Sequence, residues 1–296
     1  MKISTKILRK ELEFTKPFME RLDIPTSRLG QDKMGEIMLK THKKGLTITD
    51  DPGEHFRACL IHNRKARKGL IMYLHGGGYV AGSLEYARGF GSVISGKFDI
   101  DVYAVGYRLA PEDPYPAALD DVEEAYERLL ERGYDPRKMI ICGESAGGGL
   151  CYCLMNRLKD KGRPLPSGIV AISPWVDLTQ SGTSYILNRD KDPTLSKERL
   201  DYYAAQYADE DSRRNDRCVS PALFEMKDMP PSLIFSGGDE VMADDARILD
   251  MRLRNGGNRS ELYIREGMWH AYLLYGMKET REDYRKMGSF INELIR

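Results

Sequence analysis

The sequence predicts an α/β fold, with a mostly parallel central sheet flanked by helices. Two observations lead to this class. From about residue 70 onward, short apolar runs typical of buried strands alternate with longer segments of helical periodicity, which is the pattern of βαβ units. The chain has 296 residues, a length at which α/β folds often form one body.

The expected strands are short and apolar. They lie near residues 69–74, 102–107, 138–142, 168–172, 231–236 and 260–265. Ahead of them, two alternating runs at 45–50 and 55–61 flank a Pro-Gly pair. A turn between such runs predicts an antiparallel hairpin at the edge of the sheet.

Two segments depart from this alternation. Residues 1–22 carry apolar side chains at helical spacing, which predicts an amphipathic helix or a pair of them. The side chains in question are Ile3, Ile7, Leu8, Leu12, Phe18, Met19 and Leu22. Residues 178–218 form a polar stretch with a further helix, for which Ser196 is the expected N-cap. Its stripe consists of Leu200, Tyr203, Ala204 and Tyr207. From the residues alone, both segments can be surface helices packed on the body.

The stretch from Gly143 to Gly147 reads G-E-S-A-G and follows the expected strand at 138–142. A segment typical of a buried helix begins directly after it. A G-x-S-x-G sequence between a strand and a helix forms a strained turn that pushes the serine hydroxyl out over the sheet edge. Its glycines remove Cβ atoms where strand and helix cross closely. The pattern therefore predicts Ser145 as a nucleophile.

A second glycine-rich motif, His75-Gly76-Gly77-Gly78, follows the expected strand at 69–74. Consecutive glycines leave backbone N–H groups unhindered, and such donors stabilise the oxyanion of an acyl-transfer intermediate. The alternatives are a flexible loop or a phosphate cradle. The chain has no G-K-[ST] continuation and no G-x-G-x-x-G with a downstream acid, which favours the oxyanion interpretation.

A nucleophilic serine needs a base, and the candidates are few. The histidines are His42, His55, His62, His75 and His270. In enzymes with this type of turn the serine precedes the acid, and the acid precedes the histidine, along the chain. Only His270 lies downstream of Ser145. The alternative for His270 is a core histidine bonded to a backbone carbonyl, whereas His75 is expected to brace the glycine loop.

The acid of such a triad is expected between the serine and the histidine, at a strand end. Asp239 follows the apolar run at 231–236 and two glycines, and there it would accept a hydrogen bond from the imidazole Nδ1–H. Its competitors are Glu240, Asp244 and Asp245. We favour Asp239 because a short carboxylate is best fixed at the strand end. The later acids are expected to begin the next helix and complement its dipole.

Together these motifs resemble the hormone-sensitive-lipase-like family of α/β-hydrolase carboxylesterases, the bacterial family IV esterases related to arylacetamide deacetylase and acetyl esterases. The matching residues are His75 to Gly78, Tyr107 to Glu112, Tyr115 to Asp121, Gly143 to Gly148, Ser173 to Trp175, Asp239 and His270. The resemblance implies an α/β-hydrolase fold with a triad of Ser145, Asp239 and His270. It implies an oxyanion hole formed by the N–H groups of Gly77, Gly78 and Ala146, with His75, Gly76 and Glu144 in support.

The resemblance also implies that the two irregular segments combine into a small helical cap over Ser145. Residues 1–45 would then be the N-terminal cap helices and lead-in, and 178–218 the cap insertion. Residues 46–177 and 219–296 would form the catalytic body. The chain departs from many family members in having Glu144 in place of aspartate and Glu240 directly after Asp239. These departures leave the triad intact, but they prevent the substrate of any one subfamily from being assigned to this chain.

The composition agrees with a soluble enzyme. Lys plus Arg and Asp plus Glu both number 45, so the charge favours neither nucleic acid nor an anionic membrane as a partner. No apolar run approaches the ~20 residues of a membrane-spanning helix, and the N-terminus lacks the apolar core of a signal peptide. The cysteines are Cys59, Cys142, Cys151, Cys153 and Cys218. Buried reduced thiols are expected, which suits a cytoplasmic protein, and neither a metal site nor a cofactor is expected.

The sequence therefore predicts a cytoplasmic serine carboxylesterase that acts on short-chain esters, from acetyl to hexanoyl, through an acyl-enzyme. Its expected partner is a small-molecule ester, and the sequence does not decide whether the protein forms a homodimer. An acyl transferase or a small peptidase could use the same residues. A non-catalytic receptor is a third class, but the plant receptors that resemble this family lack the histidine that is His270 here.

Overall fold

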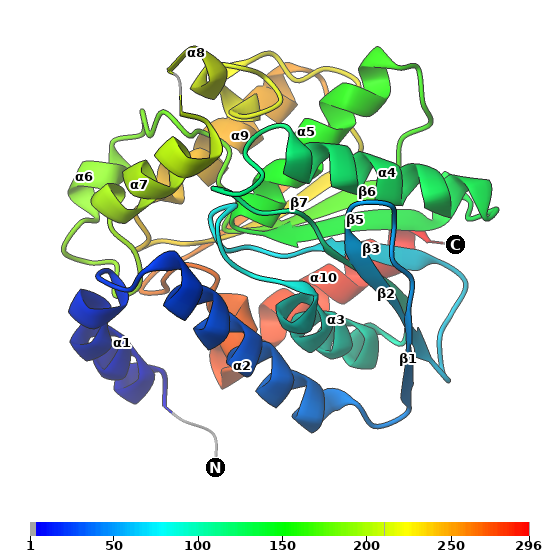
Figure 1. Cartoon of the computed structure of the whole chain (residues 1–296), viewed down its shortest axis with the longest axis horizontal. Coiled ribbons are helices and arrows are strands. Elements are labelled where there is room, and N and C mark those ends of the chain that lie inside the picture. Colours follow the sequence, from blue (N-terminus) through cyan, green and yellow to red (C-terminus); the bar gives the residue numbers. More distant parts are fainter. Residues whose placement is uncertain (1–3, 210, 296) are drawn as a thin grey trace.

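The computed structural model describes residues 4–209 and 211–295. Its centre is an eight-stranded sheet in the order β1-β2-β4-β3-β5-β6-β7-β8 (Figure 1). The strands are β1 (Leu46–Asp50), β2 (Arg57–Asn63), β3 (Leu70–Leu74), β4 (Asp101–Gly106), β5 (Met139–Glu144), β6 (Gly168–Ile172), β7 (Ser232–Gly237) and β8 (Ser260–Arg265). Strands β3 to β8 run parallel to one another, whereas β1 and β2 pair antiparallel at one edge.

Helices cover both faces of this sheet. The helices α3 (Leu84–Phe98) and α10 (Arg281–Leu294) lie on one face, and α4 (Ala117–Glu131), α5 (Ala146–Asp160) and α9 (Ala243–Asn255) lie on the other (Figure 1). Each face has its own apolar core. The central strands β3, β5, β6 and β7 are buried along their whole length, which is typical of a parallel sheet covered on both sides.

The remaining helices lie outside these two layers, and they run from the top of Figure 1 down its left side to the bottom. They are α1 (Thr5–Met19), α2 (Ile24–His42), α6 (Ser184–Leu187), α7 (Lys197–Tyr207) and α8 (Asp211–Arg214). Four single turns of 3-10 helix complete the described elements, at Pro136–Lys138, Pro221–Leu223, Tyr272–Tyr275 and Lys278–Thr280. The inserted segment, which we define as residues 178–218, contributes α6, α7 and α8.

The predicted α/β class is confirmed, and the predicted strands differ from the observed ones by at most two residues at either end. The edge hairpin and the helix capped by Ser196 are also present, with the Ser196 hydroxyl accepting a hydrogen bond from the Arg199 N–H at 3.2 Å. Of the predicted N-terminal stripe, Ile3 lies outside the described residues.

The helix α2 is the main element that hydrophobic periodicity did not reveal. Its buried residues are Ile24 and Gly35, so it has no broad apolar stripe. It packs on α3 backbone to backbone instead. A Cβ atom added at Gly35 would lie 2.4 Å from Glu85 O, and one added at Gly89 would lie 2.6 Å from Gly35 Cα. Two glycines therefore allow these helices to approach one another backbone to backbone.

Each of the five cysteines is buried and none forms a disulfide. Among the described helices, none combines the length and the apolar character that crossing a membrane requires.

The turn between β5 and α5 forces three backbone segments into contact. A Cβ atom added at Gly147 would lie 2.1 Å from Leu74 O and 2.4 Å from His75 O. One added at Gly143 would lie 2.3 Å from Gly147 O. Only glycine allows α5 to begin this close to the end of β3, and that approach places Ser145 beside the glycine loop.

Gly147→Ala should therefore destabilise the protein, because its methyl group collides with backbone atoms that cannot rotate away. We expect a loss of at least ~1–3 kcal/mol in the free energy of unfolding, measured by urea denaturation. Gly30→Ala is the matched control. Gly30 lies in exposed α2 with nothing within 4 Å of an added Cβ, so this change should stabilise by up to ~1 kcal/mol. Equal stability of the two variants would contradict the close packing of this turn.

Candidate active site

The loops that follow β3, β5, β6, β7 and β8 meet at one edge of the sheet. Because these strands are parallel and adjacent, their carboxyl ends lie side by side, and such an edge is where α/β proteins place their sites. The loops bring the glycine motif, Ser145, the Glu240 region and His270 into one neighbourhood. The structure thus gathers motifs that are almost 200 residues apart in the sequence, from Gly76 to His270.

Ser145 occupies a strained backbone position. Its φ is 55° and its ψ is −124°, a conformation that costs a non-glycine residue ~1–3 kcal/mol. Its N–H donates to Ile172 O at 2.9 Å, and its carbonyl accepts from the N–H of Trp175 at 2.9 Å. These bonds to β6 and to the loop after it hold the turn in place. The residue is 7% exposed, so little of Ser145 is accessible to solvent.

The glycine loop lies directly against this turn. A Cβ atom added at Gly76 would be 2.9 Å from Ser145 Cβ. Gly77 and Gly78 have φ values of 119° and 63°, and within residues 4–209 and 211–295 their N–H groups have no hydrogen-bond acceptor. The N–H of Ala146 opens α5 and has no partner inside that helix. The three N–H groups named from the resemblance are therefore free to bind an anion.

His75 lies under the glycine loop, where it bonds to Gly76 and stacks on Tyr107. Its Nδ1 is 2.7 Å from Gly76 O, and its ring stacks on Tyr107 with centroids 4.2 Å apart. The Tyr107 hydroxyl donates to His75 O at 2.6 Å. Burial lowers the pKa of His75 to about 4, which keeps the ring neutral at physiological pH. A neutral, stacked ring can support the loop without adding charge to the site.

Glu144 is buried between β3 and the glycine loop. Its Oε2 accepts from the Tyr73 hydroxyl at 2.5 Å, and its Oε1 accepts from the Gly76 N–H at 2.6 Å. Burial raises the pKa of this carboxyl to about 7, against an ordinary 4.5. Glu144 therefore fixes the first glycine of the glycine loop through a direct hydrogen bond.

His270 is paired with Glu240. The Nδ1 of His270 is 2.9 Å from Glu240 Oε2. Since an ionised carboxylate only accepts hydrogen bonds, Nδ1 carries the proton and Nε2 is left as the basic nitrogen. The expectation that Asp239 is the partner of His270 is wrong. The alternative of a histidine bonded to a backbone carbonyl is not what the structure shows either, because the partner is a carboxylate.

Side-chain length and direction explain why Glu240 is the partner. The Glu240 side chain turns back toward β7, where its Oε1 accepts from the Gly237 N–H at 2.9 Å and from the Ser236 hydroxyl. The carboxylate is fully buried and is held from behind, so that Oε2 faces the imidazole. A glutamate reaches this position from one residue beyond the site that we favoured for a short aspartate.

Asp239 points the other way, to the N-terminal helix. Its Oδ2 accepts from Arg9 Nη1 at 2.7 Å. The other competitors begin α9, as expected. Of these, Asp245 is buried and accepts from the N–H groups of Val176 and Asp177, at 3.0 Å each, which ties α9 to the loop after β6.

The inserted segment also reaches the site. A Cβ atom added at Gly78 would lie 2.4 Å from the Tyr203 ring of α7. Asn188 Nδ2 donates to Glu240 O at 2.9 Å, and Asp192 Oδ2 accepts from the Val241 N–H at 2.9 Å. The segment therefore touches both the glycine loop and the loop that carries Glu240. Polarity alone does not distinguish Asn188 and Asp192 from a solvent-exposed stretch, so sequence reasoning did not find them.

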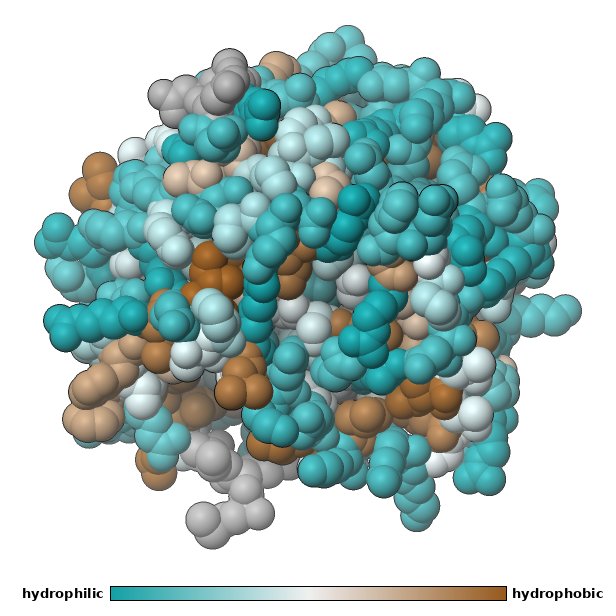
Figure 2. All heavy atoms as spheres, viewed as in Figure 1, coloured by the Kyte–Doolittle hydropathy of each residue, from teal (hydrophilic) through white to brown (hydrophobic). Residues whose placement is uncertain are grey.

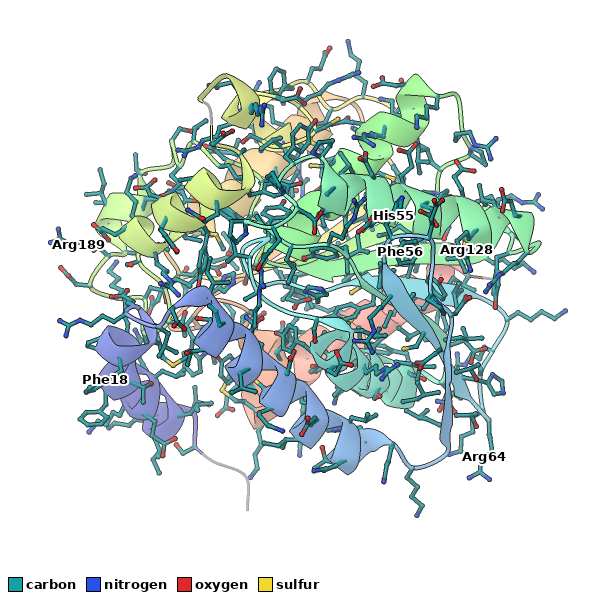
Figure 3. All side chains as sticks on the ribbon, viewed as in Figure 1. Phe18, His55, Phe56, Arg64, Arg128 and Arg189 are labelled. Atoms are coloured by element: carbon teal, nitrogen blue, oxygen red, sulfur yellow. The ribbon has the colours of Figure 1, made fainter. Side chains whose placement is uncertain are left out.

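The inserted segment is bonded to the N-terminal helices as well. Arg199 of α7 donates to Glu20 O at 3.1 Å and to Leu22 O at 2.7 Å, in the link between α1 and α2. In Figure 3, Phe18 on α1 and Arg189 after α6 both project outward on this side of the molecule. Within the described part of the chain, no group of three or more His, Cys, Asp or Glu side chains is placed to hold a metal ion.

Comparison with known proteins gives a consistent result. Residues 71–274 match the model of a family described as having the alpha/beta hydrolase fold. An esterase of Acinetobacter venetianus is 32% identical over 227 residues, which cover 76% of this chain and 75% of that protein. An acetyl-hydrolase of Streptomyces hygroscopicus is 34% identical over 223 residues, covering 75% and 74%.

Solved structures are similar over nearly the whole chain. A hormone-sensitive lipase from a metagenome library superposes with a TM-score of 0.92 at 28% identity, covering 100% of both chains. The esterase EstE5, soaked with p-nitrophenyl butyrate, gives a TM-score of 0.89 at 29% identity, covering 98% of both chains.

Glu144→Gln should change how stability depends on pH. The folded protein holds this proton up to about pH 7, whereas the unfolded carboxyl releases it near its ordinary 4.5. Folding therefore takes up a proton between these values, and the free energy of unfolding falls as the pH rises through them. Glutamine still accepts from Gly76 but cannot ionise. Relative to the variant, the wild-type protein should lose roughly 3 kcal/mol across this window.

Urea unfolding of both proteins at about pH 5 and about pH 8 measures this difference. All other titrating groups are common to the two proteins, so they cancel in the comparison. Parallel pH profiles would show that the Glu144 carboxyl is not perturbed.

Proposed function

This chain belongs to the α/β-hydrolase fold family, and we propose that it is a serine carboxylesterase in which Ser145, His270 and Glu240 act together. Its class is that of a carboxylic ester hydrolase, like the esterases and acetyl-hydrolase that it resembles. The observation that carries the proposed mechanism is the pairing of His270 with the buried Glu240 at 2.9 Å. It lies at the same sheet edge as the strained Ser145.

In the proposed reaction, the Ser145 hydroxyl attacks the ester carbonyl while His270 Nε2 removes its proton. Glu240 holds the imidazole through Nδ1–H and stabilises the imidazolium that forms. The negative charge on the carbonyl oxygen is bound by the N–H groups of Gly77, Gly78 and Ala146. His270 then gives its proton to the leaving alcohol, and water releases the acyl group by the reverse sequence.

We infer that α1, α2 and the inserted segment form a cap over this site. Support comes from their mutual hydrogen bonds through Arg199 and from the contact of Tyr203 with Gly78. Tyr207 of α7 also stacks on Tyr79, with ring centroids 3.9 Å apart. The Tyr203 ring leaves no space for a side chain at Gly78, and we infer that the cap restricts the acyl group to a small size.

The outer surface of this cap is mixed in character. The side chains of Arg189 and Asp190 are 65% and 88% exposed, and such charges disfavour contact with lipid, whereas the neighbouring Asp192 is buried. The outer faces of α1 and α6 carry exposed apolar side chains. Exposed there are Ile7, Phe14, Phe18, Met19, Ile186 and Leu187, and Figure 2 shows brown and tan side chains over the α1 region. A direct test of interfacial activity is therefore informative.

Ser145→Ala, His270→Ala and Glu240→Gln should each lower kcat for p-nitrophenyl acetate by ~10³–10⁴-fold, because the three groups act in one step. The serine and histidine changes should not be additive in the double variant. Asp239→Asn is the matched control for Glu240→Gln, since it removes the adjacent carboxylate that faces Arg9. It should cost about tenfold or less, the effect of one charge-assisted hydrogen bond. A larger loss from Asp239→Asn than from Glu240→Gln would reverse the assignment of the acid.

The ratio kcat/KM should be highest for acyl chains of roughly two to six carbons, because the cap packs onto Gly78 of the proposed oxyanion hole through the Tyr203 ring. A series of p-nitrophenyl esters with increasing acyl length measures this preference. Turnover should rise smoothly with tributyrin concentration and show no jump at its solubility limit. A maximum at about twelve carbons, or a clear jump on emulsified substrate, would instead assign the apolar face of α1 to a lipid interface.

A further inference from the structure

Arg9 of α1 connects the N-terminal helix to three other segments. Its Nη1 donates to Asp239 Oδ2 at 2.7 Å and to Gly267 O at 3.0 Å, and its Nη2 donates to Lys191 O at 2.5 Å. Its Nε donates to Glu13 within α1 at 3.0 Å. The Arg9 side chain is 24% exposed. One side chain thus bonds to the loop after β7, the loop after β8 and the inserted segment.

These partners are next to the reacting groups. Asp239 directly precedes Glu240, and Gly267 lies three residues before His270. The two loops are already joined by the bond from the Asp239 N–H to Met268 O at 3.0 Å. Lys191 directly precedes Asp192, which holds the Val241 N–H. Arg9 therefore bonds to both loops that carry the Glu240–His270 pair, and to the segment that holds one of them.

These bonds matter more for the positions of the atoms that they join than for the stability of the protein. A partly exposed ion pair contributes little to stability, because solvent screens it. A guanidinium, however, presents several donors in a rigid plane, and it can fix three acceptors relative to one another. Lysine has a single flexible ammonium and cannot do so. Catalytic groups have to be held to within ~0.5 Å of their productive positions. The Arg9 guanidinium, which bonds to both loops, can restrict their relative movement in this way.

We propose that Arg9 is a positioning residue, which couples the docking of α1 to the alignment of Glu240 with His270. Arg9 touches neither the substrate nor the imidazole. It acts through Asp239 and Gly267, and it makes the N-terminal helix a part of the machinery of the site. The inference rests on the proposed function, because it assumes that the Glu240–His270 pair works in catalysis.

The test compares Arg9→Met, Arg9→Lys and the control Lys10→Met in the full-length chain. Lys10 is the next residue on α1 and its side chain is exposed. Titration with paraoxon counts the reactive serines, so that kcat is expressed per competent site. For Arg9→Met we expect kcat to fall by ~10–100-fold, as for a displacement of the catalytic groups by about 1 Å. KM should stay within about twofold. Arg9→Lys should recover part of the loss, and Lys10→Met should behave as wild type.

A purely structural role predicts a different pattern. The melting temperature and the number of titratable serines would fall, but kcat per titrated serine would not change, and that result overturns the proposal. The double variant Arg9→Met/Asp239→Asn adds a second check. If both residues act through one contact, its kcat should match that of Arg9→Met within about twofold. Fully additive losses would also count against the coupling.

An NMR measurement separates this inference from the proposed function. The proton on His270 Nδ1, bonded to Glu240, gives a low-field resonance that does not depend on turnover. We expect it to shift or broaden in Arg9→Met and to persist in Lys10→Met. If the resonance is unchanged in Arg9→Met, the positioning role is wrong even if the protein is an esterase. If wild type hydrolyses no ester but the resonance responds, the proposed function fails while the structural coupling holds.

Discussion

The contact between the start of α5 and the end of β3 is the constraint on which the site depends. Gly147 lies against the carbonyls of Leu74 and His75, and no side chain fits between them. This contact brings Ser145 of one loop next to the glycine motif of another, which the proposed mechanism requires. It also forces Ser145 into its unfavourable backbone angles. The bonds from that residue to Ile172 and Trp175 offset this strain.

Around this fixed point, buried polar groups hold the loops, each with a defined partner. Glu144 binds the glycine loop, Glu240 is held by β7, and Asp245 binds the loop after β6. A buried carboxylate is costly unless it is hydrogen-bonded, and each of these accepts at least two bonds. The loops at the sheet edge are thus fixed by carboxylates that come from the end of β5, from the loop after β7 and from the start of α9.

The sequence was a good guide where one pattern had one explanation. Alternation of apolar runs located the strands, and the position of the glycines located Ser145. His270 followed because the chain has no other histidine downstream of that serine. The acid was different. Asp239 and Glu240 are adjacent carboxylates whose side chains point in opposite directions. Glu240 bonds to Ser236 at the end of β7, whereas Asp239 bonds to Arg9, which is remote in the sequence. Direction of this kind is a tertiary property. The helix α2 was missed for a related reason, because it packs through Gly35 and Gly89, and glycines leave no hydrophobic stripe to read.

The reactivity of two buried thiols measures local unfolding of the turn between β5 and α5. Cys142 immediately precedes the turn that carries Ser145, and Cys151 Sγ donates to Gly147 O at 3.1 Å on the other side of it. Burial raises the pKa of both thiols, and only the thiolate reacts readily with electrophiles. Chemical labelling of these two cysteines therefore has to wait for the β5–α5 turn to open, and its rate reports how often this part of the chain leaves its folded state.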